Sequence, residues 1–321
     1  RMSISQGVIR VPRGVQTAAG VLLTAGLVLA AAGAVVLPRW LGPRTASTPA
    51  GLETQADDAE RLWRQAVGIV ARARGVSTGE ALIGSEWTPL VTTLGEAEAK
   101  RVSMSPAWPR ALVREFHGAG LRRGDVVAAS FSGSFPGINL AVMSAAEAMG
   151  LSLAAVSSVT SSSWGASDPG FTWPEMEARL VAAGALRKAT VAVSAGGDGD
   201  RALDLDGDGQ SRAREIAARC AGQLGARLID PADFEEAIRA RLDAFDEARA
   251  GRPLAAFVNV GGTEAALGRS PAILKVQNGW LGKAPFDSSP GRGLVARMVE
   301  QGVPVLHILH VRGLAVRWGI L

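Results

Sequence analysis

The sequence contains one cysteine, Cys220, and only three histidines in 321 residues. A single cysteine excludes an internal disulfide framework and any zinc or iron–sulfur site built from several cysteines. Three histidines also argue against a histidine-rich catalytic zinc site. Neither GxGxxG nor GxxxxGK[ST] occurs, so the dinucleotide-binding and P-loop fingerprints are absent as well.

An excess of positive charge is missing from most of the chain, although the net charge is +4. Five of the 34 basic residues and none of the 30 acidic ones lie in residues 1–44, so residues 45–321 carry a net charge of −1. The basic surface that a nucleic-acid-binding protein needs is therefore lacking, and we expect no nucleic-acid partner.

The N-terminal segment contains a long apolar run. Residues 17–37 have no charged side chain and are flanked by arginines, and a helix of about 20 such residues spans the hydrocarbon core of a bilayer. We predict a tail at 1–16, a transmembrane anchor at 17–38, a linker at 39–56 and a folded domain at 57–321. The chain would then be a single-pass protein of the cell membrane with an extracytoplasmic domain. A cleaved signal peptide is the alternative, although signal sequences usually have shorter apolar runs.

Short apolar runs alternate with amphipathic segments through the rest of the chain. Strands are expected at 125–131, 151–159, 189–194, 227–229, 254–260 and 303–309. Helices are expected at 57–74, 108–120, 138–149, 174–183, 211–224, 231–249 and 293–301, with Asp230 as the cap of the sixth. This alternation indicates βαβ units, hence an α/β fold with a mainly parallel sheet and helices on both faces.

The loops that follow the expected strands are rich in serine, glycine and asparagine. Ligands of open parallel sheets bind at the carboxyl ends of the strands, and hydroxyls with backbone N–H groups at helix N-termini favour an anion such as a carboxylate. We expect these loops to converge on one hollow. These loops are residues 132–139, 157–168, 196–200 and 259–264.

The segment FSGSFPGIN at 131–139 resembles a strand–turn–helix nucleophile elbow in layout. It departs from GxSxG because phenylalanines flank the serines where glycines would lie. The alternative is a tight turn whose serines cap the following helix. A Ser…Asp…His order is also present along the chain. The candidate catalytic residues are Ser132, Ser134, Asp168 and His310.

An acidic segment matches the pattern of a calcium-binding loop. The sequence DLDGDGQSRARE follows the spacing D-x-D-x-D-G-x5-E, in which carboxylate oxygens bind Ca²⁺. The alternative is a solvated acidic turn that begins a helix. The candidate metal ligands are Asp204, Asp206, Asp208 and Glu215.

A charged and irregular stretch at 84–104 precedes the alternating part. It is expected to form either a flap over the ligand edge of the sheet or a charged surface loop. Lys100 and Arg101 form a local basic cluster there, and Arg312 and Arg317 form a second one near the C-terminus.

Five stretches together are similar to one family. They are residues 84–106, 130–142, 157–177, 256–268 and 302–315, and they resemble the poly-gamma-glutamate system protein family. The resemblance implies a role in a bacterial system that makes or exports poly-γ-glutamate, with a ligase-like synthetase and small membrane proteins as partners. The DLDGDG insert at 204–209 is not part of its pattern. The residues at its motif positions, which the resemblance makes the predicted ligand-binding residues, are Ser132, Gly133, Ser134, Asn139, Ser162, Trp164, Asp168, Asn259, Gly261 and Gly262.

Three hypotheses of function follow. The first is a membrane-anchored accessory component of poly-γ-glutamate synthesis or export that binds polymer, a carboxylate ligand or partner subunits. The second is a serine-dependent hydrolase or transferase acting on γ-glutamyl amide bonds. The third is a structural module stabilised by Ca²⁺.

Overall fold

A seven-stranded sheet forms the centre of the protein in the computed structural model, which describes residues 49–282 and 291–321. The strand order is β6-β5-β3-β2-β7-β9-β8. Neighbouring strands pair in parallel except β8 with β9, which are antiparallel. The strands are β2 (Val126–Phe131), β3 (Ser152–Ser158), β5 (Thr190–Ser194), β6 (Arg227–Ile229), β7 (Leu254–Val260), β8 (Gly279–Leu281) and β9 (Val305–Ile308).

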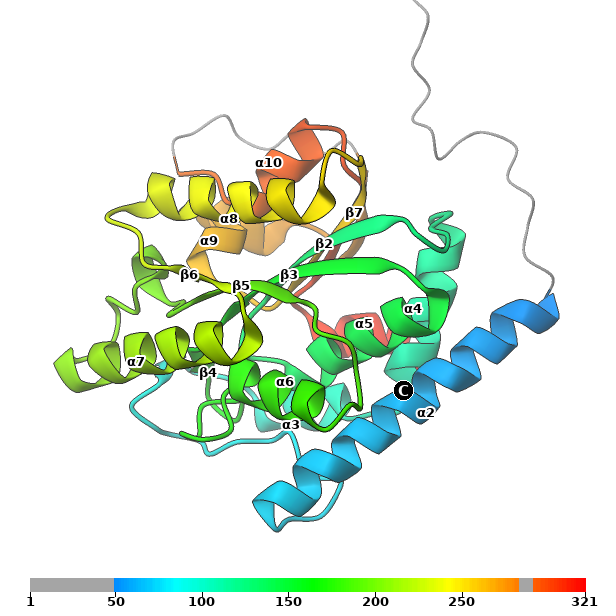
Figure 1. Ribbon diagram of the computed structural model, residues 1–321, viewed down its shortest axis with the longest axis horizontal. Coiled ribbons are helices and arrows are strands. Elements are labelled where there is room, and N and C mark those ends of the chain that lie inside the picture. The colour runs from blue at the N-terminus through cyan, green and yellow to red at the C-terminus, as the bar shows by residue number, and fades with distance from the viewer. Residues whose placement is uncertain (1–48, 283–290) are drawn as a thin grey trace, which may run out of the picture. The chain divides into compact units, whose positions relative to one another are not determined.

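Helices cover both faces of this sheet, as Figure 1 shows. On β2, Val127 and Ala129 face one apolar cluster and Ala128 faces another, because alternate side chains of a strand point to opposite faces. One layer contains α2 (Pro49–Arg74), α4 (Ala107–Gly118), α5 (Pro136–Met149), α6 (Trp173–Ala182) and α7 (Gly207–Leu224); the other contains α8 (Phe234–Arg249), α9 (Glu264–Leu267) and α10 (Leu294–Glu300). The predicted α/β class with a mainly parallel sheet is confirmed.

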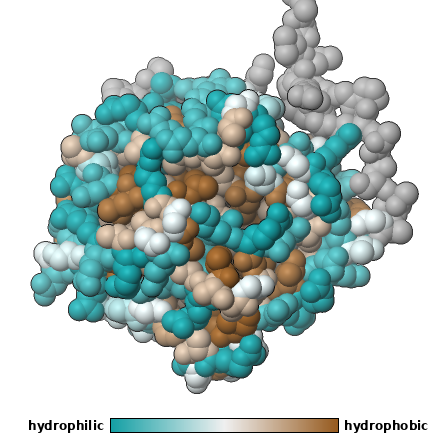
Figure 2. All heavy atoms as spheres, viewed as in Figure 1, coloured by the Kyte–Doolittle hydropathy of each residue, from teal (hydrophilic) through white to brown (hydrophobic). Residues whose placement is uncertain are grey.

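Polar and apolar residues separate on one face of the molecule. On the face drawn in Figure 2, polar residues surround the rim and apolar residues gather near its centre. All residues of β2 are buried, and all except Ser130 are apolar. Burial on both faces explains why this strand shows no polar alternation in the sequence.

The helix ends follow from local sequence chemistry. Pro136 occupies the first turn of α5, and Gly150 ends that helix in the left-handed conformation at φ 68°. Thr172 and Glu175 form a capping box at the start of α6. Asp233 caps α8 by accepting a hydrogen bond from Glu236 N at 2.8 Å, so the prediction that Asp230 is the cap was wrong.

A second sheet of two short parallel strands brings the charged stretch at 84–104 to the carboxyl edge of the main sheet. It consists of β1 (Val91–Thr93) and β4 (Ser161–Ser162). Four short helices lie nearby: α3 (Ala97–Ser103), η2 (Asp198–Asp200), η3 (Pro271–Lys275) and α11 (Val311–Arg317).

The folded region begins earlier than expected. Helix α2 starts at Pro49 and buries Ala56 completely, so residues 49–56 are helical and are not part of a linker. The apolar contacts of α2 with α4 and α5 explain why the helix extends this far. The predicted tail at 1–16 and transmembrane segment at 17–38 lie outside the described residues. Within the described ranges, every helix is too short or too polar to cross a bilayer.

Candidate functional site

The connections of the sheet reverse direction between β2 and β7. From β2 the chain proceeds outward through β3, β5 and β6, and it then returns to β7, on the other side of β2, before reaching β9. Ligands of open α/β sheets bind in the crevice outside the carboxyl ends of the strands at such a switch point. A cleft of about 980 Å³ lies at this place.

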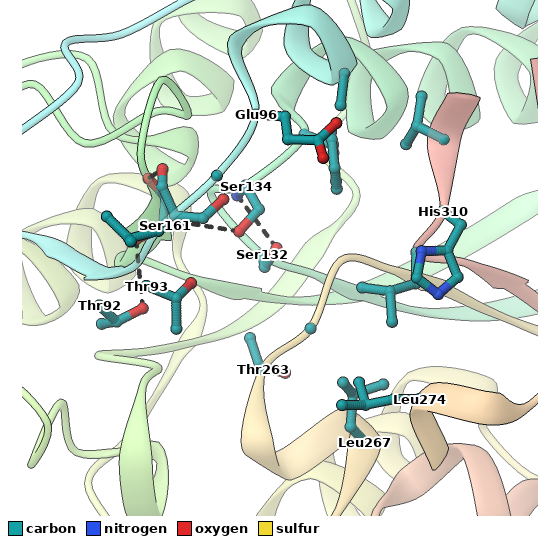
Figure 3. A pocket seen from close by; sticks show the side chains of 18 of the residues that line it. Thr92, Thr93, Glu96, Ser132, Ser134, Ser161, Thr263, Leu267, Leu274 and His310 are labelled. Atoms are coloured by element: carbon teal, nitrogen blue, oxygen red, sulfur yellow. Dashed lines mark hydrogen bonds between the residues drawn. The ribbon is translucent and has the colours of Figure 1, made fainter. Parts of the chain in front are cut away.

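Loops from four strands form the walls of the cleft. They contribute Ser132, Ser134, Thr160, Gly197 and Thr263, among other residues. Figure 3 shows Ser132, Ser134 and Ser161 grouped on one wall, with Thr263, Leu267 and Leu274 across from them. The structure therefore brings the serine- and glycine-rich turns to one hollow, and the segment at 92–100 forms a further wall.

Some predicted ligand-binding residues line the cleft and others support it. Ser132, Ser134, Ser162 and Gly262 line the cleft, as does the candidate catalytic residue His310. His310 is exposed and lies on the opposite side from the serines (Figure 3).

The supporting residues shape the loops from behind. Asn139 Nδ2 donates a hydrogen bond of 2.8 Å to the carbonyl oxygen of Ser132, and Asn259 Nδ2 donates one of 2.9 Å to that of Gly261. Gly261 has φ +86°, and a Cβ there would lie 2.0 Å from Ser132 Oγ. Gly133 likewise has no room for a Cβ, which would lie 2.8 Å from Ser161 Cβ. These four residues therefore fix the backbone that presents the serines.

Two predicted residues lie outside the cleft wall. Asp168 forms an ion pair of 2.8 Å with Arg74 and accepts a hydrogen bond from Ser85 N at 3.2 Å. Trp164 belongs to the same loop, where its backbone N–H donates to the carbonyl oxygen of Ser85. Asp168 therefore holds the 84–85 segment against α2, and no Ser–Asp–His triad is formed with it.

The structure does not form the predicted calcium site. Asp206 caps α7 by accepting a hydrogen bond of 2.7 Å from Gly209 N, and Asp204 accepts one of 3.0 Å from Asp198 N. Glu215 extends from α7 into solvent beside Arg219. Asp208 is exposed in the first turn of α7. Residues 49–282 and 291–321 hold no group of three or more acidic, histidine or cysteine side chains able to bind a metal ion. The acidic segment acts as a helix start.

Lys100 lines the cleft, but the sequence pattern did not distinguish it from its exposed neighbour Arg101. Its side chain, on α3, is 2% exposed, whereas Arg101 points to solvent and pairs with Glu98. Lys100 Nζ donates hydrogen bonds to the carbonyl oxygen of Ser134 and, at 2.7 Å, to Ser162 Oγ. It also lies 4.0 Å from the centre of the Phe135 ring. Burial lowers the pKa of Lys100 from 10.5 to about 7.

The serine hydroxyls are ordered by backbone groups. Ser134 N donates to Ser132 Oγ at 3.2 Å, and Ser162 N donates to Ser134 Oγ at 3.1 Å. A hydroxyl that accepts one such bond still has its own proton to donate. Ser132 and Ser134 therefore present O–H donors to a ligand in the cleft.

The charges and apolar groups of the cleft are mixed. Glu96 pairs with Arg312 at 3.5 Å, and Glu264 pairs with Arg269 at 2.7 Å, so two of its carboxylates are partly compensated. Asp198 and Asp204 lie at the η2 side. The lining also includes large exposed apolar side chains, which are Leu94, Leu274, Val316 and Leu321. The cleft thus suits a chain that has both polar groups and methylene segments.

A buried ion pair holds the strand ends beside these loops. Arg241, on α8, bonds Asp200 through Nε and Nη2, each at 2.7 Å, and both residues are almost fully buried. Its Nη2 also donates to Ser158 Oγ at 2.9 Å and Ser194 Oγ at 2.8 Å. One side chain therefore ties β3 and β5 to η2.

His307 is fully buried on β9 and contacts Asn259, one of the residues that shape the cleft loops. Asn259 Nδ2 and His307 Nδ1 are 3.0 Å apart; because an amide nitrogen only donates, Nδ1 accepts and the ring proton is on Nε2. Burial, and to a smaller extent the charge of His310, lowers the pKa of His307 to about 4. The imidazole is therefore neutral at physiological pH.

Acidification is expected to destabilise the fold through His307. Between pH 6.5 and about 4, the unfolded chain takes up a proton that the folded protein does not, so stability falls as the pH falls, by up to about 1.4 kcal/mol per unit. Urea unfolding should give a lower free energy of unfolding at pH 4.5 than at pH 7, and this loss should be smaller in His307→Leu than in the unchanged protein. His117→Gln, at a half-buried histidine, is the control and should retain the loss; equal losses in all three proteins would contradict the assignment.

The structure is thus that of an α/β protein with a cleft at the switch point of its sheet. Comparisons of the chain with protein-family models, with curated proteins and with solved structures found no match.

Proposed function

We propose that this protein is a membrane-anchored accessory component of poly-γ-glutamate synthesis or export, and that its cleft binds a γ-glutamyl chain. The observation that carries this proposal is the convergence of hydroxyl-bearing loops from four strands on one cleft. The resemblance of the five motifs supports a role in the poly-γ-glutamate system, and the predicted transmembrane anchor at 17–38 supports the membrane location.

The chemistry of a γ-glutamyl chain fits the cleft. Each unit carries one α-carboxylate and two backbone methylenes. The Ser132 and Ser134 hydroxyls, together with the N-terminus of the 14-residue helix α5 that follows them, favour the carboxylate. The apolar side chains of the lining, such as Leu94 and Leu274, favour the methylenes.

Binding can be tested by calorimetry with a γ-glutamyl oligomer and the full-length chain in detergent. Replacing both serines, in Ser132→Ala/Ser134→Ala, removes two hydroxyl donors and should weaken binding roughly tenfold or more, because each hydrogen bond contributes about 1 kcal/mol. An oligomer whose α-carboxylates are amidated should bind more weakly to the unchanged protein.

The matched control is Ser211→Ala on α7, whose hydroxyl donates a hydrogen bond to Gly207 O and lies outside the cleft. This variant should bind as the unchanged protein does. Equal affinity for the acidic and amidated oligomers, or unchanged affinity in the double variant, would contradict the proposal. In cells, deletion of the gene should reduce secreted polymer, and the double variant should restore it less well than Ser211→Ala.

A further inference from the structure

Ser162 differs from the other serines of the cleft because an amine lies against its hydroxyl. Lys100 Nζ is 2.7 Å from Ser162 Oγ, which is within hydrogen-bonding distance. The second bond of Nζ, to the carbonyl oxygen of Ser134, and its contact with Phe135 fix the amine in this position. Ser162 itself is half-buried and lines the cleft.

Ser132 and Ser134, the serines that the sequence suggested as nucleophiles, lack such a partner. The contacts of their hydroxyls in the described structure are the backbone N–H groups of Ser134 and Ser162, respectively. A serine nucleophile needs an adjacent base to take its proton. The geometry therefore favours Ser162 over both.

Lys100 has the properties of such a base. It forms no ion pair within the described residues, and desolvation is the cause of its lowered pKa of about 7. A substantial fraction of the amine is then neutral at physiological pH and has a lone pair that can accept a proton. An exposed lysine, which is almost fully protonated there, could not act in this way.

We propose that Ser162 and Lys100 form a catalytic pair that transfers or hydrolyses an acyl group, with an amide as substrate. Ser162 Oγ gives its proton to Lys100 Nζ and attacks the carbonyl carbon. The C–N bond then breaks, the leaving amine takes the proton from Nζ, and an ester to Ser162 remains. Water, or an acceptor amine, attacks this ester; its proton passes through Nζ to Ser162 Oγ as the C–O bond breaks.

The surroundings of Ser162 leave its hydroxyl accessible. A Cβ on Gly95 would lie 3.1 Å from Ser162 Oγ and 2.8 Å from the carbonyl oxygen of Ser163. Because residue 95 has no side chain, a substrate can reach the Ser162 hydroxyl from this side. The α5 N-terminus begins at Pro136, next to Phe135 in the cleft wall, where its positive end favours the negative charge that develops on the carbonyl oxygen. The choice of a γ-glutamyl amide as the substrate rests on the proposed function; the catalytic pair does not.

The first experiment detects the acyl intermediate. The full-length chain in detergent is treated with p-nitrophenyl acetate, and the acetyl group is located by peptide mass spectrometry. Acetylation is expected on Ser162 and should be lost in Ser162→Ala. Ser163→Ala is the adjacent control, because its buried hydroxyl has no hydrogen-bond partner among residues 49–282 and 291–321. This variant should be acetylated at Ser162 as before. Absence of acetyl from Ser162 in the unchanged protein would overturn the proposal.

The second experiment tests the role of Lys100 and the substrate class. Release of the fluorophore from γ-glutamyl-7-amino-4-methylcoumarin should fall about 10³-fold in Ser162→Ala and Lys100→Met. Lys100→Arg retains a cation but cannot supply a neutral base, and it should lose activity equally if it folds. Activity retained in Ser162→Ala or in Lys100→Arg would overturn the assigned roles.

The outcomes separate this inference from the binding function. If Ser162 is acetylated but the γ-glutamyl oligomer does not bind, the catalytic pair stands and the proposed function fails. If the oligomer binds but Ser162 is not acetylated, the proposed function stands and the pair fails.

Discussion

Arg241→Met is expected to lower the free energy of unfolding by about 3–5 kcal/mol, because removal of one partner leaves a buried charge without compensation. Asp200 is 1% exposed, and the described structure gives its carboxylate two partners, Arg241 and Ser194. The hydroxyls of Ser158 and Ser194 also lose a donor in this variant. Denaturation by urea at pH 7 measures the effect.

The matched control is Arg239→Met, two residues earlier on the same helix, where the side chain is exposed. It should change the free energy of unfolding by less than about 0.5 kcal/mol. In the double variant Arg241→Met/Asp200→Asn the charge of Asp200 is removed as well, and the loss should be smaller than the sum of the two single losses. A loss in Arg241→Met equal to that in Arg239→Met would show that this ion pair does not support the fold.

The hydrogen-bond network around Arg241 also holds the loops that form the cleft. Arg241 connects Ser158 at the end of β3, Ser194 at the end of β5 and Asp200 in η2. The residues that follow these points, Thr160 and Gly197, line the cleft. A protein that remains folded after the substitution should therefore bind its ligand less tightly, even though residue 241 does not line the cleft.

Much of the fold could be predicted because its signals are local. A buried parallel strand such as β2 is a short apolar run, and helix ends such as Gly150 depend on a few neighbouring residues. The strand β8 was not predicted, because it pairs antiparallel with β9 and so does not belong to the βαβ alternation that marked the other strands of the main sheet. Asp230 and Asp233 have the same side chain, so only the observed start of α8 at Phe234 distinguishes them.

The candidate site could be predicted only in part, because its members come from distant segments. Strand ends identified Ser132 and Ser134 as cleft residues, since parallel strands end at one edge. The partner of Asp168 is Arg74, 94 residues earlier, which no local pattern reveals. Likewise Lys100 and Arg101 are adjacent in the sequence, yet one is buried and the other exposed, because α3 packs with one face toward the loops of 134–135 and 162.

Lys100→Met is expected to stabilise the protein at pH 7 and to remove a rise in stability toward pH 10. The folded pKa of Lys100 is about 7 and its ordinary value is 10.5. Between these values the unfolded chain binds a proton that the folded protein does not, so stability increases as the pH rises through this window. The full cost of burying the ammonium applies below about pH 7 and amounts to a few kcal/mol.

Other charged groups line the same cleft in both proteins, so the difference between the two proteins is the informative quantity. They are Glu96 at the N-cap of α3, His310 and Arg312 at the start of α11, and Asp198, Asp204 and Glu264. Cys220, whose pKa burial raises to about 12, contributes the opposite slope above pH 9 in both proteins. The free energy of unfolding is therefore measured by urea at pH 7, 8, 9 and 10 in each.

The control is Lys275→Met, at an exposed lysine on η3, which should keep the pH dependence of the unchanged protein. A slope between pH 7 and pH 10 that is identical in Lys100→Met and the unchanged protein would contradict a lowered pKa at Lys100, and with it the neutral amine beside Ser162. If Lys100→Met instead stabilises the protein, the natural chain keeps a buried amine at the expense of stability. This is expected of a group that acts in the cleft.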